Sequence, residues 1–289
     1  MNPDEPDDHN LLARLGLSNA LLLGQGGEAR VYAASAHEVI RIMRPGASLE
    51  DALVRQQLLG EIAAGAKGLP FQTPVVRRVE SIEGRTLSFE ERLAGEPVSA
   101  LLARLEGTAR RQLVASYLDT ALRIGDIAVA RNWHGPLLGP AELRRQCWHD
   151  FLRTRLEQVA AVCPADLRDA VLGEAKRNWD EPASPELVHL DYFPANALAR
   201  DQAVTAVIDF GPGAVMGDRR FDAWGAVAYL DAEISPHAND EDRQQTRAWL
   251  ADHRLVEQYE PARRWIAASW THATDDAGLM AWCRRVLLA

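Results

Sequence analysis

Two carboxylates and one carboxamide lie close together in the sequence, at positions where they could hold a cation or move a proton. Asp191 and Asn196 occur in the segment LVHLDYFPANALA, between two strand-like apolar runs, and Asp209 follows in the segment AVIDFG. Carboxylate and amide oxygens are hard ligands that suit Mg²⁺. A single carboxylate on a tight loop can instead accept a proton from a hydroxyl. Ordinary turn formation is the alternative for either segment alone, because Asp, Asn and Pro are common turn residues.

A glycine-rich segment, GQGGEARV, lies near the start of the chain. Its residues Gly24, Gly26 and Gly27 fall between two strand-like runs. Glycine lets a backbone turn tightly and approach phosphate groups closely. A strand and not a helix follows, so the segment is not a dinucleotide-binding fingerprint, and it lacks the Gly-Lys-Ser/Thr ending of a Walker A loop. A plain β-hairpin turn is the alternative interpretation.

The elements that must position these residues change in kind along the chain. Short strand-like runs with glycine turns dominate at first, around one helix that begins at the capping box formed by Ser48 and Asp51. Amphipathic helices dominate later. This segregation predicts an α+β fold with two lobes, a small strand-rich lobe over residues 1–92 and a larger, mainly helical lobe over residues 93–289. The predicted helices cover residues 48–66, 108–131, 141–162 and 164–178, with several more beyond residue 218.

The composition of the chain excludes some classes of function. The 289 residues carry 32 basic and 41 acidic side chains, a formal net charge of −9, which argues against a nucleic-acid binder. No apolar run approaches the roughly 20 residues that span a bilayer, and the acidic N-terminus does not resemble a signal peptide. Three cysteines without metal-ligand spacing are typical of reduced thiols. We therefore expect a soluble, cytoplasmic protein without a membrane or nucleic-acid partner.

Together, the two polar segments resemble a known family. His189-x-Asp191-x-x-x-x-Asn196, followed by Ile208-Asp209-Phe210-Gly211, is similar to the catalytic loop and metal motif of the aminoglycoside phosphotransferase and choline kinase group, which has a protein-kinase-like fold. The segment FEERLAGEPV resembles the hinge that receives adenine, and GDRRFDAW resembles the Gly-Asp-x-x-x-Asp segment after the metal motif. The resemblance implies a bilobal kinase-like fold and an ATP- and Mg²⁺-dependent transfer of phosphate to a hydroxyl of a small molecule.

The resemblance also implies roles for the residues of the two motifs. Asp191 would be the catalytic base, which orients the acceptor hydroxyl and takes its proton. Asn196 and Asp209 would hold Mg²⁺. His189 would support the loop and would not carry a proton.

Further residues would hold the nucleotide. The glycines of GQGGEARV would cover the phosphates, and the backbone from Glu91 to Leu93 would receive adenine. Kinase-like folds usually place a lysine on the third strand, paired with a glutamate of the following helix, but this chain offers Arg41. An arginine fork can bind phosphate oxygens at two points. An outward-facing strand position is the alternative for Arg41. Its expected partner by spacing is Glu61, and Glu50 is the rival.

Two departures from the pattern of this family leave the identity of the acceptor undetermined. The usual glycines of the group are replaced by Leu190 and Ala195, which adds side chains near the active loop. The acceptor is expected to be a small hydroxylated molecule that could carry positive charge, although the acidic and tryptophan-rich C-terminal third is also typical of a solvated face over core tryptophans. The alternatives are a nucleotide-binding pseudokinase or binding module, and a metabolite kinase of the choline, homoserine or fructosamine type. No pattern indicates an oligomeric state.

Overall fold

The computed structural model describes residues 8–289 and divides into two compact units. The first unit comprises the described residues up to 64 together with residues 73–93, and the second unit comprises residues 65–72 and 94–289. Our sequence-based division lies after residue 92 and leaves residues 65–72 in the first lobe. The first seven residues, which bear on the signal-peptide prediction, lie outside the described range.

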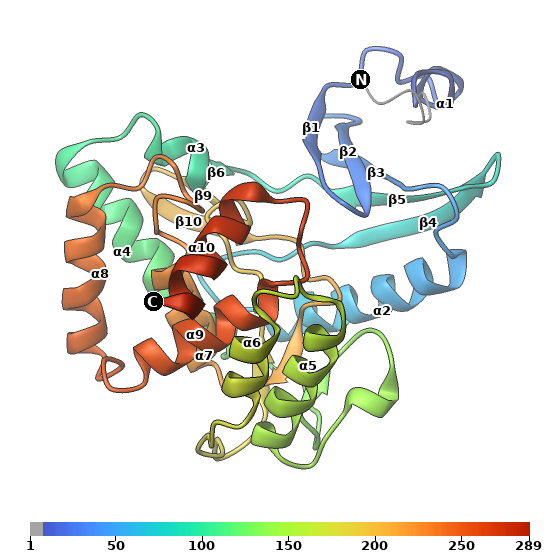
Figure 1. Ribbon diagram of the computed structural model, residues 1–289. Helices are drawn as coiled ribbons and strands as arrows, with labels where there is room; N and C mark the ends of the chain where they lie inside the picture. Colours follow the sequence, from blue (N-terminus) through green and yellow to red (C-terminus); the bar gives the residue numbers. More distant parts are fainter. Residues whose placement is uncertain (1–7) are drawn as a thin grey trace. The chain divides into compact units, whose positions relative to one another are not determined.

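An antiparallel five-stranded sheet forms the first unit, with strand order β1-β2-β3-β5-β4 (Figure 1). Two helices accompany it, α1 (His9–Arg14) and α2 (Leu49–Gly65). The helix predicted over residues 48–66 is therefore present. The backbone N–H of Asp51 donates to Ser48 Oγ at 3.2 Å, which is one of the two hydrogen bonds of a capping box. The strands are β1 (Leu22–Gln25), β2 (Ala29–Ala33), β3 (Glu38–Met43), β4 (Val76–Ile82) and β5 (Arg85–Glu91).

The two faces of this sheet differ in chemistry because successive residues of a strand point to opposite sides. On one face, buried apolar residues of β3 and β5 pack against α1; they are Ile40, Ile42, Leu87 and Phe89, with Leu11 and Leu12 from the helix. On the other face, Arg41 lies opposite Ser88 in the strand register. Glu90, two residues further along β5, points to the same side as Ser88. The first unit therefore has an apolar core on one side of the sheet and a polar cluster on the other.

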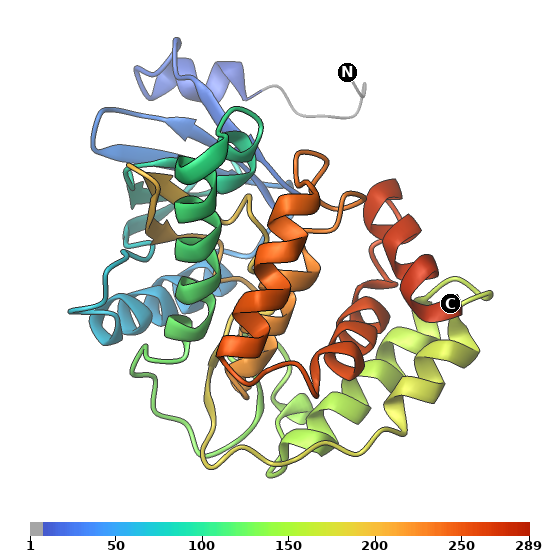
Figure 2. The same cartoon turned by 90° about the vertical axis from the view of Figure 1, so that its left-hand side faces the viewer.

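Helices dominate the second unit, together with two small three-stranded sheets (Figures 1 and 2). One sheet has the order β10-β9-β6 and the other the order β7-β11-β8. The strands are β6 (Glu96–Pro97), β7 (Gly135–Pro136), β8 (Glu186–Val188), β9 (Ala197–Arg200), β10 (Ala203–Val207) and β11 (Val215–Gly217). The helices are α3 (Val98–Leu102), α4 (Gly107–Ile124), η1 (Ala141–Leu143), α5 (Trp148–Val162), α6 (Arg168–Ala175), α7 (Arg220–Ala228), α8 (Asp240–Asp252), α9 (Tyr259–Trp270) and α10 (Ala277–Leu288).

One predicted helix of this unit, residues 141–162, is wrong in its first part. A single 3-10 turn at residues 141–143 is followed by extended chain, and α5 begins only at Trp148. The cause is a tertiary pairing, because His134 and Arg145 exchange both backbone hydrogen bonds at 2.8 Å. The backbone N–H of Arg145 therefore bonds to another segment and not within a helix. The helix predicted over residues 108–131 likewise ends early, at Ile124.

Aromatic side chains fill the core of the second unit. Phe221 of α7 makes edge contacts with Trp148, Trp224 and Trp265, at centroid distances of 5.2 to 5.4 Å. Trp282 of α10 is also fully buried. The interpretation of the C-terminal tryptophans as core residues is therefore confirmed for Trp224, Trp265 and Trp282, whereas Trp270 is half-buried. None of the helices within residues 8–289 is long and apolar enough to cross a membrane.

Candidate active site

A tight loop between β8 and β9 contains Asp191 and Asn196. The backbone N–H of Phe193 donates to the carbonyl of Asp191 at 2.9 Å, and the N–H of Asn196 donates to the carbonyl of Phe193 at 2.8 Å. The side-chain amide of Asn196 also donates from Nδ2 to the carbonyl of Asp191, at 2.8 Å. The position of Asn196 is therefore tied to Asp191 through a direct hydrogen bond.

Asp222 of α7 anchors the start of this loop. Its carboxylate accepts the backbone N–H of His189 at Oδ2, at 2.7 Å, and that of Leu190 at Oδ1, at 2.8 Å. Leu190 has a φ of +59°, in the left-handed region that L side chains adopt at a cost. Its carbonyl accepts the hydroxyl of Tyr229 at 2.8 Å. Both backbone polar groups of Leu190 are therefore held, which explains how the loop keeps a leucine in a backbone conformation that favours glycine.

The segment that contains Asp209 is bonded to the same loop. The backbone N–H of Ile208 donates to the carbonyl of Asn196 at 2.9 Å, and His189 Nε2 donates to the carbonyl of Ile208 at 2.9 Å. Asp209 itself has a φ of +66°. Burial lowers the pKa of His189, so the ring is neutral at pH 7 and spans the two segments as a hydrogen-bond donor. This geometry is the support that we predicted for His189.

The donor atoms of this site suit Mg²⁺ shared with a phosphate-bearing ligand. Because the loop uses Nδ2 of Asn196, the amide oxygen is the atom available to ligate a cation. One carboxylate and one amide oxygen match the way in which Mg²⁺ binds, through few protein ligands together with phosphate oxygens and waters. Within residues 8–289, no group of three or more His, Cys, Asp or Glu side chains forms a metal cage. Such a cage is not needed for an ion that is also bound by a nucleotide.

In the first unit, Arg41 lies beside a carboxylate that the sequence analysis did not single out. Arg41 Nε is 3.5 Å from Glu90 Oε1, and both side chains are largely buried. Of the two predicted partners on α2, Glu61 is half-buried and Glu50 is exposed. Glu90 lies two residues from Ser88, so both side chains lie on the same face of their strand. Its proximity to Arg41 depends on the pairing of β3 with β5 and could be recognised only once the strand order was known.

The predicted phosphate-covering glycines lie at the turn between β1 and β2. Gly24 is in β1, and Gly26 and Gly27 follow it. The backbone N–H of Gly26 donates to the carbonyl of Ala29 at 2.9 Å, which closes the hairpin. A Cβ atom built on any of the three glycines would meet no atom within 4 Å, and none has a positive φ. Neither backbone conformation nor packing therefore requires glycine here.

The predicted adenine segment is partly used by the sheet. The backbone N–H of Glu91 donates to the carbonyl of Val75, and the N–H of Arg92 donates to that of His37, both at 2.9 Å. The side chain of Glu91 forms an exposed ion pair with Arg77. Leu93 ends the first unit. Because the N–H groups of Glu91 and Arg92 are engaged, the prediction for this segment depends mainly on Leu93.

Several acidic residues of the C-terminal third serve structural purposes. Asp242 completes a capping box with Asn239 at the start of α8 and forms a buried ion pair with Arg110 at 2.6 Å. This pair joins α8 to α4, which run side by side in Figure 2. The side chain of Asp276 accepts the backbone N–H of Leu279 at 2.9 Å and so caps the start of α10. Asp240 and Glu241 pair with arginines on the surface.

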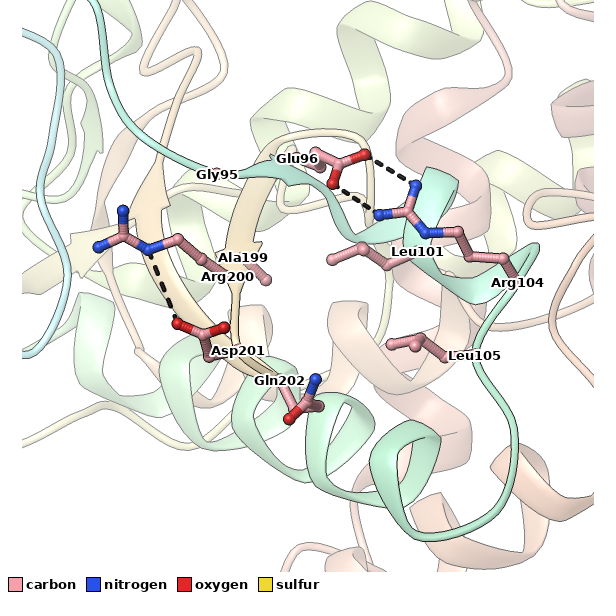
Figure 3. A pocket seen from close by; sticks show the side chains of 9 residues that line it. All are labelled: Gly95, Glu96, Leu101, Arg104, Leu105, Ala199, Arg200, Asp201 and Gln202. Carbon is pink, nitrogen blue, oxygen red and sulfur yellow. Dashed lines mark hydrogen bonds and ion pairs between the residues drawn. The ribbon is translucent and has the colours of Figure 1, made fainter.

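An open hollow of about 420 Å³ lies at the edge of the β10-β9-β6 sheet (Figure 3). Its charged side chains are paired with one another: Glu96 accepts two hydrogen bonds from Arg104, at 2.6 and 2.8 Å, and Arg200 lies 3.9 Å from Asp201. It contains none of the predicted site residues. The residues that line the hollow therefore do not include any residue of the loop that contains Asp191.

Comparisons with known proteins agree with this geometry. Residues 20–259 match the phosphotransferase enzyme family. No curated protein matches the chain. Among solved structures, the macrolide 2'-phosphotransferase MphH from Brachybacterium faecium is 20% identical, with a TM-score of 0.55 and coverage of 96% of this chain and 97% of that one.

Two aminoglycoside phosphotransferase structures are also similar. APH(2'')-IIa in complex with gentamicin is 12% identical, with a TM-score of 0.63 and coverage of 96% and 94%. APH(3'')-Id from Streptomyces rimosus is 15% identical, with a TM-score of 0.58 and coverage of 91% and 95%. At these identities the likeness concerns the fold, and it confirms the predicted α+β, kinase-like architecture. The match over residues 20–259 shows that the chain belongs to the phosphotransferase enzyme family and is a small-molecule phosphotransferase.

Proposed function

We propose that the protein transfers the γ-phosphate of ATP, bound with Mg²⁺, to a hydroxyl of a small molecule. The observation that carries this proposal is the hydrogen-bonded unit of Asp191, Asn196 and the backbone before Asp209. Phosphoryl transfer needs positioning and charge neutralisation more than covalent chemistry by the protein, and such a unit supplies positioning. Similar structures include one complex with ATP and others with GDP, so GTP is the nucleotide to test beside ATP.

Each residue of the loop has a separate task in this reaction. The acceptor hydroxyl oxygen bonds to the γ-phosphorus, the bond from that phosphorus to the β,γ-bridging oxygen breaks, and ADP leaves. Asp191 orients the hydroxyl and accepts its proton. Asn196 and Asp209 would hold Mg²⁺, which neutralises phosphate charge when bound.

The first unit would hold the nucleotide. Gly24, Gly26 and Gly27 leave the hairpin backbone open to phosphate oxygens, which gives a reason for three glycines that the fold does not require. The guanidinium of Arg41 would bind phosphate, and Leu93 would present its backbone to adenine. ATP as a substrate, together with three free cysteines, favours a cytoplasmic location.

The acceptor is proposed to be a hydroxylated molecule with a ring or another apolar face. Phe193 of the loop stacks on Tyr229 at 3.8 Å between ring centroids, and the indole N–H of Trp270 donates to the Tyr229 hydroxyl at 2.9 Å. Phe193 and Trp270 are both only half-buried. Aromatic faces accept apolar groups and single cations. A polycation would instead require several carboxylates, and many of those in the C-terminal third are engaged with arginines.

Replacement of the proposed base tests this function. Asp191→Asn keeps the size of the side chain but removes the proton acceptor, so ADP release with the best hydroxylated acceptor should slow by about 10²–10⁴-fold. Affinity for Mg·ATP, measured by calorimetry, should stay within a few-fold of the wild type. Asp252→Asn, at an exposed position of α8, is the matched control.

The result separates the candidate functions. A pseudokinase or binding module would bind Mg·ATP, but no acceptor would stimulate ADP release by the wild type. A metabolite kinase would turn over a choline-, homoserine- or fructosamine-type acceptor in the same screen. An Asp191→Asn variant that works at the wild-type rate would refute the role of Asp191.

A further inference from the structure

A buried carboxylate of β5 accepts two hydrogen bonds and forms an ion pair on a single oxygen. Glu90 Oε1 accepts the hydroxyl of Ser88 at 2.7 Å and Nη1 of Arg55 at 3.1 Å, and it lies 3.5 Å from Nε of Arg41. Glu90 is 5% exposed and Arg55 is 8% exposed. The three partners come from β5 itself, from α2 and from β3 (Figure 1). All of these residues belong to the first unit.

Stability alone gives no reason for this arrangement. A buried ion pair can often be replaced by well-packed apolar residues without loss of stability, because its charges must leave water. What the cluster does supply is geometry, since one oxygen is shared by two guanidinium groups on different elements. A planar guanidinium that is held in place matches phosphate oxygens in a two-pronged manner and keeps its charge when buried. A loose arginine would lose side-chain entropy each time it bound a phosphate.

We propose that Glu90 is the positioning residue for the phosphate-binding Arg41, and that Arg55 helps to orient the same carboxylate. This inference rests on the proposed function, in which Arg41 contacts the nucleotide phosphates. The carboxylate that orients the Arg41 guanidinium thus lies on β5, the neighbour of β3 in the sheet. Any contribution from the glutamates of α2 would be additional. Ser88 orients the carboxylate through its hydroxyl.

A double-mutant cycle tests whether Glu90 acts through Arg41. The variants are Glu90→Gln, Arg41→Ala and their combination, with calorimetry of Mg·ATP and ADP release as the two readouts. Arg41→Ala should weaken Mg·ATP binding by about 10- to 100-fold, as expected for loss of a hydrogen bond between charged groups. Glu90→Gln should weaken it by about 3- to 10-fold, because an untethered guanidinium must be ordered on binding. The combination should bind as weakly as Arg41→Ala alone.

The sign of the Glu90→Gln effect distinguishes positioning from net charge. Removal of a negative charge near a triphosphate site would by itself strengthen binding, so weaker binding reports lost orientation. Tighter binding by Glu90→Gln would overturn the proposal. An equal loss in the wild-type and Arg41→Ala backgrounds would also overturn it, because a purely structural role adds independently. Glu80→Gln, in an exposed ion pair of β4, is the matched control and should bind Mg·ATP like the wild type.

Two further outcomes are decided by the same measurements. If Glu90→Gln does not fold, Ser88→Ala replaces it in the cycle, since it removes one donor to Glu90 Oε1 and leaves both arginines. It should weaken binding about 2- to 3-fold, and only when Arg41 is present. If the wild type binds Mg·ATP but never transfers phosphate, the proposed function fails while the binding cycle still decides the role of Glu90. A wild type that binds no nucleotide would refute both.

Discussion

Replacement of Asp222 by asparagine should remove a specific pH dependence of stability. Burial raises the pKa of Asp222 from 3.8 to about 7, and the backbone N–H groups of His189 and Leu190 oppose this shift. Because the folded state binds this proton more tightly than the unfolded state, the free energy of unfolding falls as pH rises from about 4 to about 7. A shift of about three pKa units corresponds to about 4 kcal/mol. Asp222→Asn cannot ionise, so it should lack this loss.

The same substitution should disturb the loop between β8 and β9. The asparagine amide can accept only one of the two N–H groups, and a buried N–H without an acceptor costs about 1–3 kcal/mol. The strained backbone of Leu190 is then held less firmly, and a shift of about 1 Å in the following Asp191 can cost about 10²-fold in rate. We therefore expect the variant to gain stability relative to the wild type as pH rises, yet to transfer phosphate about 10²-fold more slowly.

Urea denaturation followed by circular dichroism, at intervals between pH 4.5 and pH 8, measures the first effect. ADP release at pH 7.5 measures the second. The difference in free energy of unfolding between variant and wild type should move by several kcal/mol across this range. A difference that stays constant within about 1 kcal/mol would refute the assignment of a raised pKa to Asp222.

Two further predictions concern the same loop and the proposed magnesium ligand Asp209. Leu190→Gly removes the side chain from a residue with a φ of +59° and should raise the free energy of unfolding by about 1 kcal/mol, as measured by thermal or chemical denaturation. A free energy of unfolding below that of the wild type would show that the leucine side chain contributes more through packing than it costs in strain. Asp209→Asn removes the proposed carboxylate ligand of Mg²⁺. We expect Mg²⁺ to tighten ATP binding to the wild type by about tenfold, or about 1.4 kcal/mol, and to tighten it little in the variant. Calorimetry with and without Mg²⁺ measures this difference, and equal tightening in both proteins would contradict the proposed metal site.

Features set by local chemistry could be predicted from the sequence. The helix over residues 48–66 was recognisable because Ser48 and the apolar stripe act within one segment, and the structure gives α2 almost the same bounds. The loop between β8 and β9 was recognisable because polar residues at short spacings interrupt two apolar runs. The α+β fold followed from the order of such segments, and the family followed from the resemblance of the two polar motifs to those of known phosphotransferases.

Features that depend on distant partners could not be predicted in this way. Glu90 and Glu91 are adjacent acidic residues of one strand, and the sequence does not show which of them is buried. The burial of Glu90 is evident only from the structure, in which Arg55 of α2 donates to its carboxylate. Asp222 belongs to a recognised segment, but its contacts with the backbone of His189 and Leu190 arise from tertiary packing. The break before α5 has the same origin, since His134 competes for the backbone of Arg145.

The arginine at position 41 has a practical consequence for chemical probes. The chain has only two lysines, Lys67 and Lys176, and both are exposed residues of the second unit. A nucleotide analogue that carries an acylating group would react with a side-chain amine beside the phosphates, and a guanidinium is a far weaker nucleophile because it stays protonated. Under the proposed role of Arg41, such reagents should leave the strand that contains it unmodified, so lysine acylation would not report nucleotide binding by this protein.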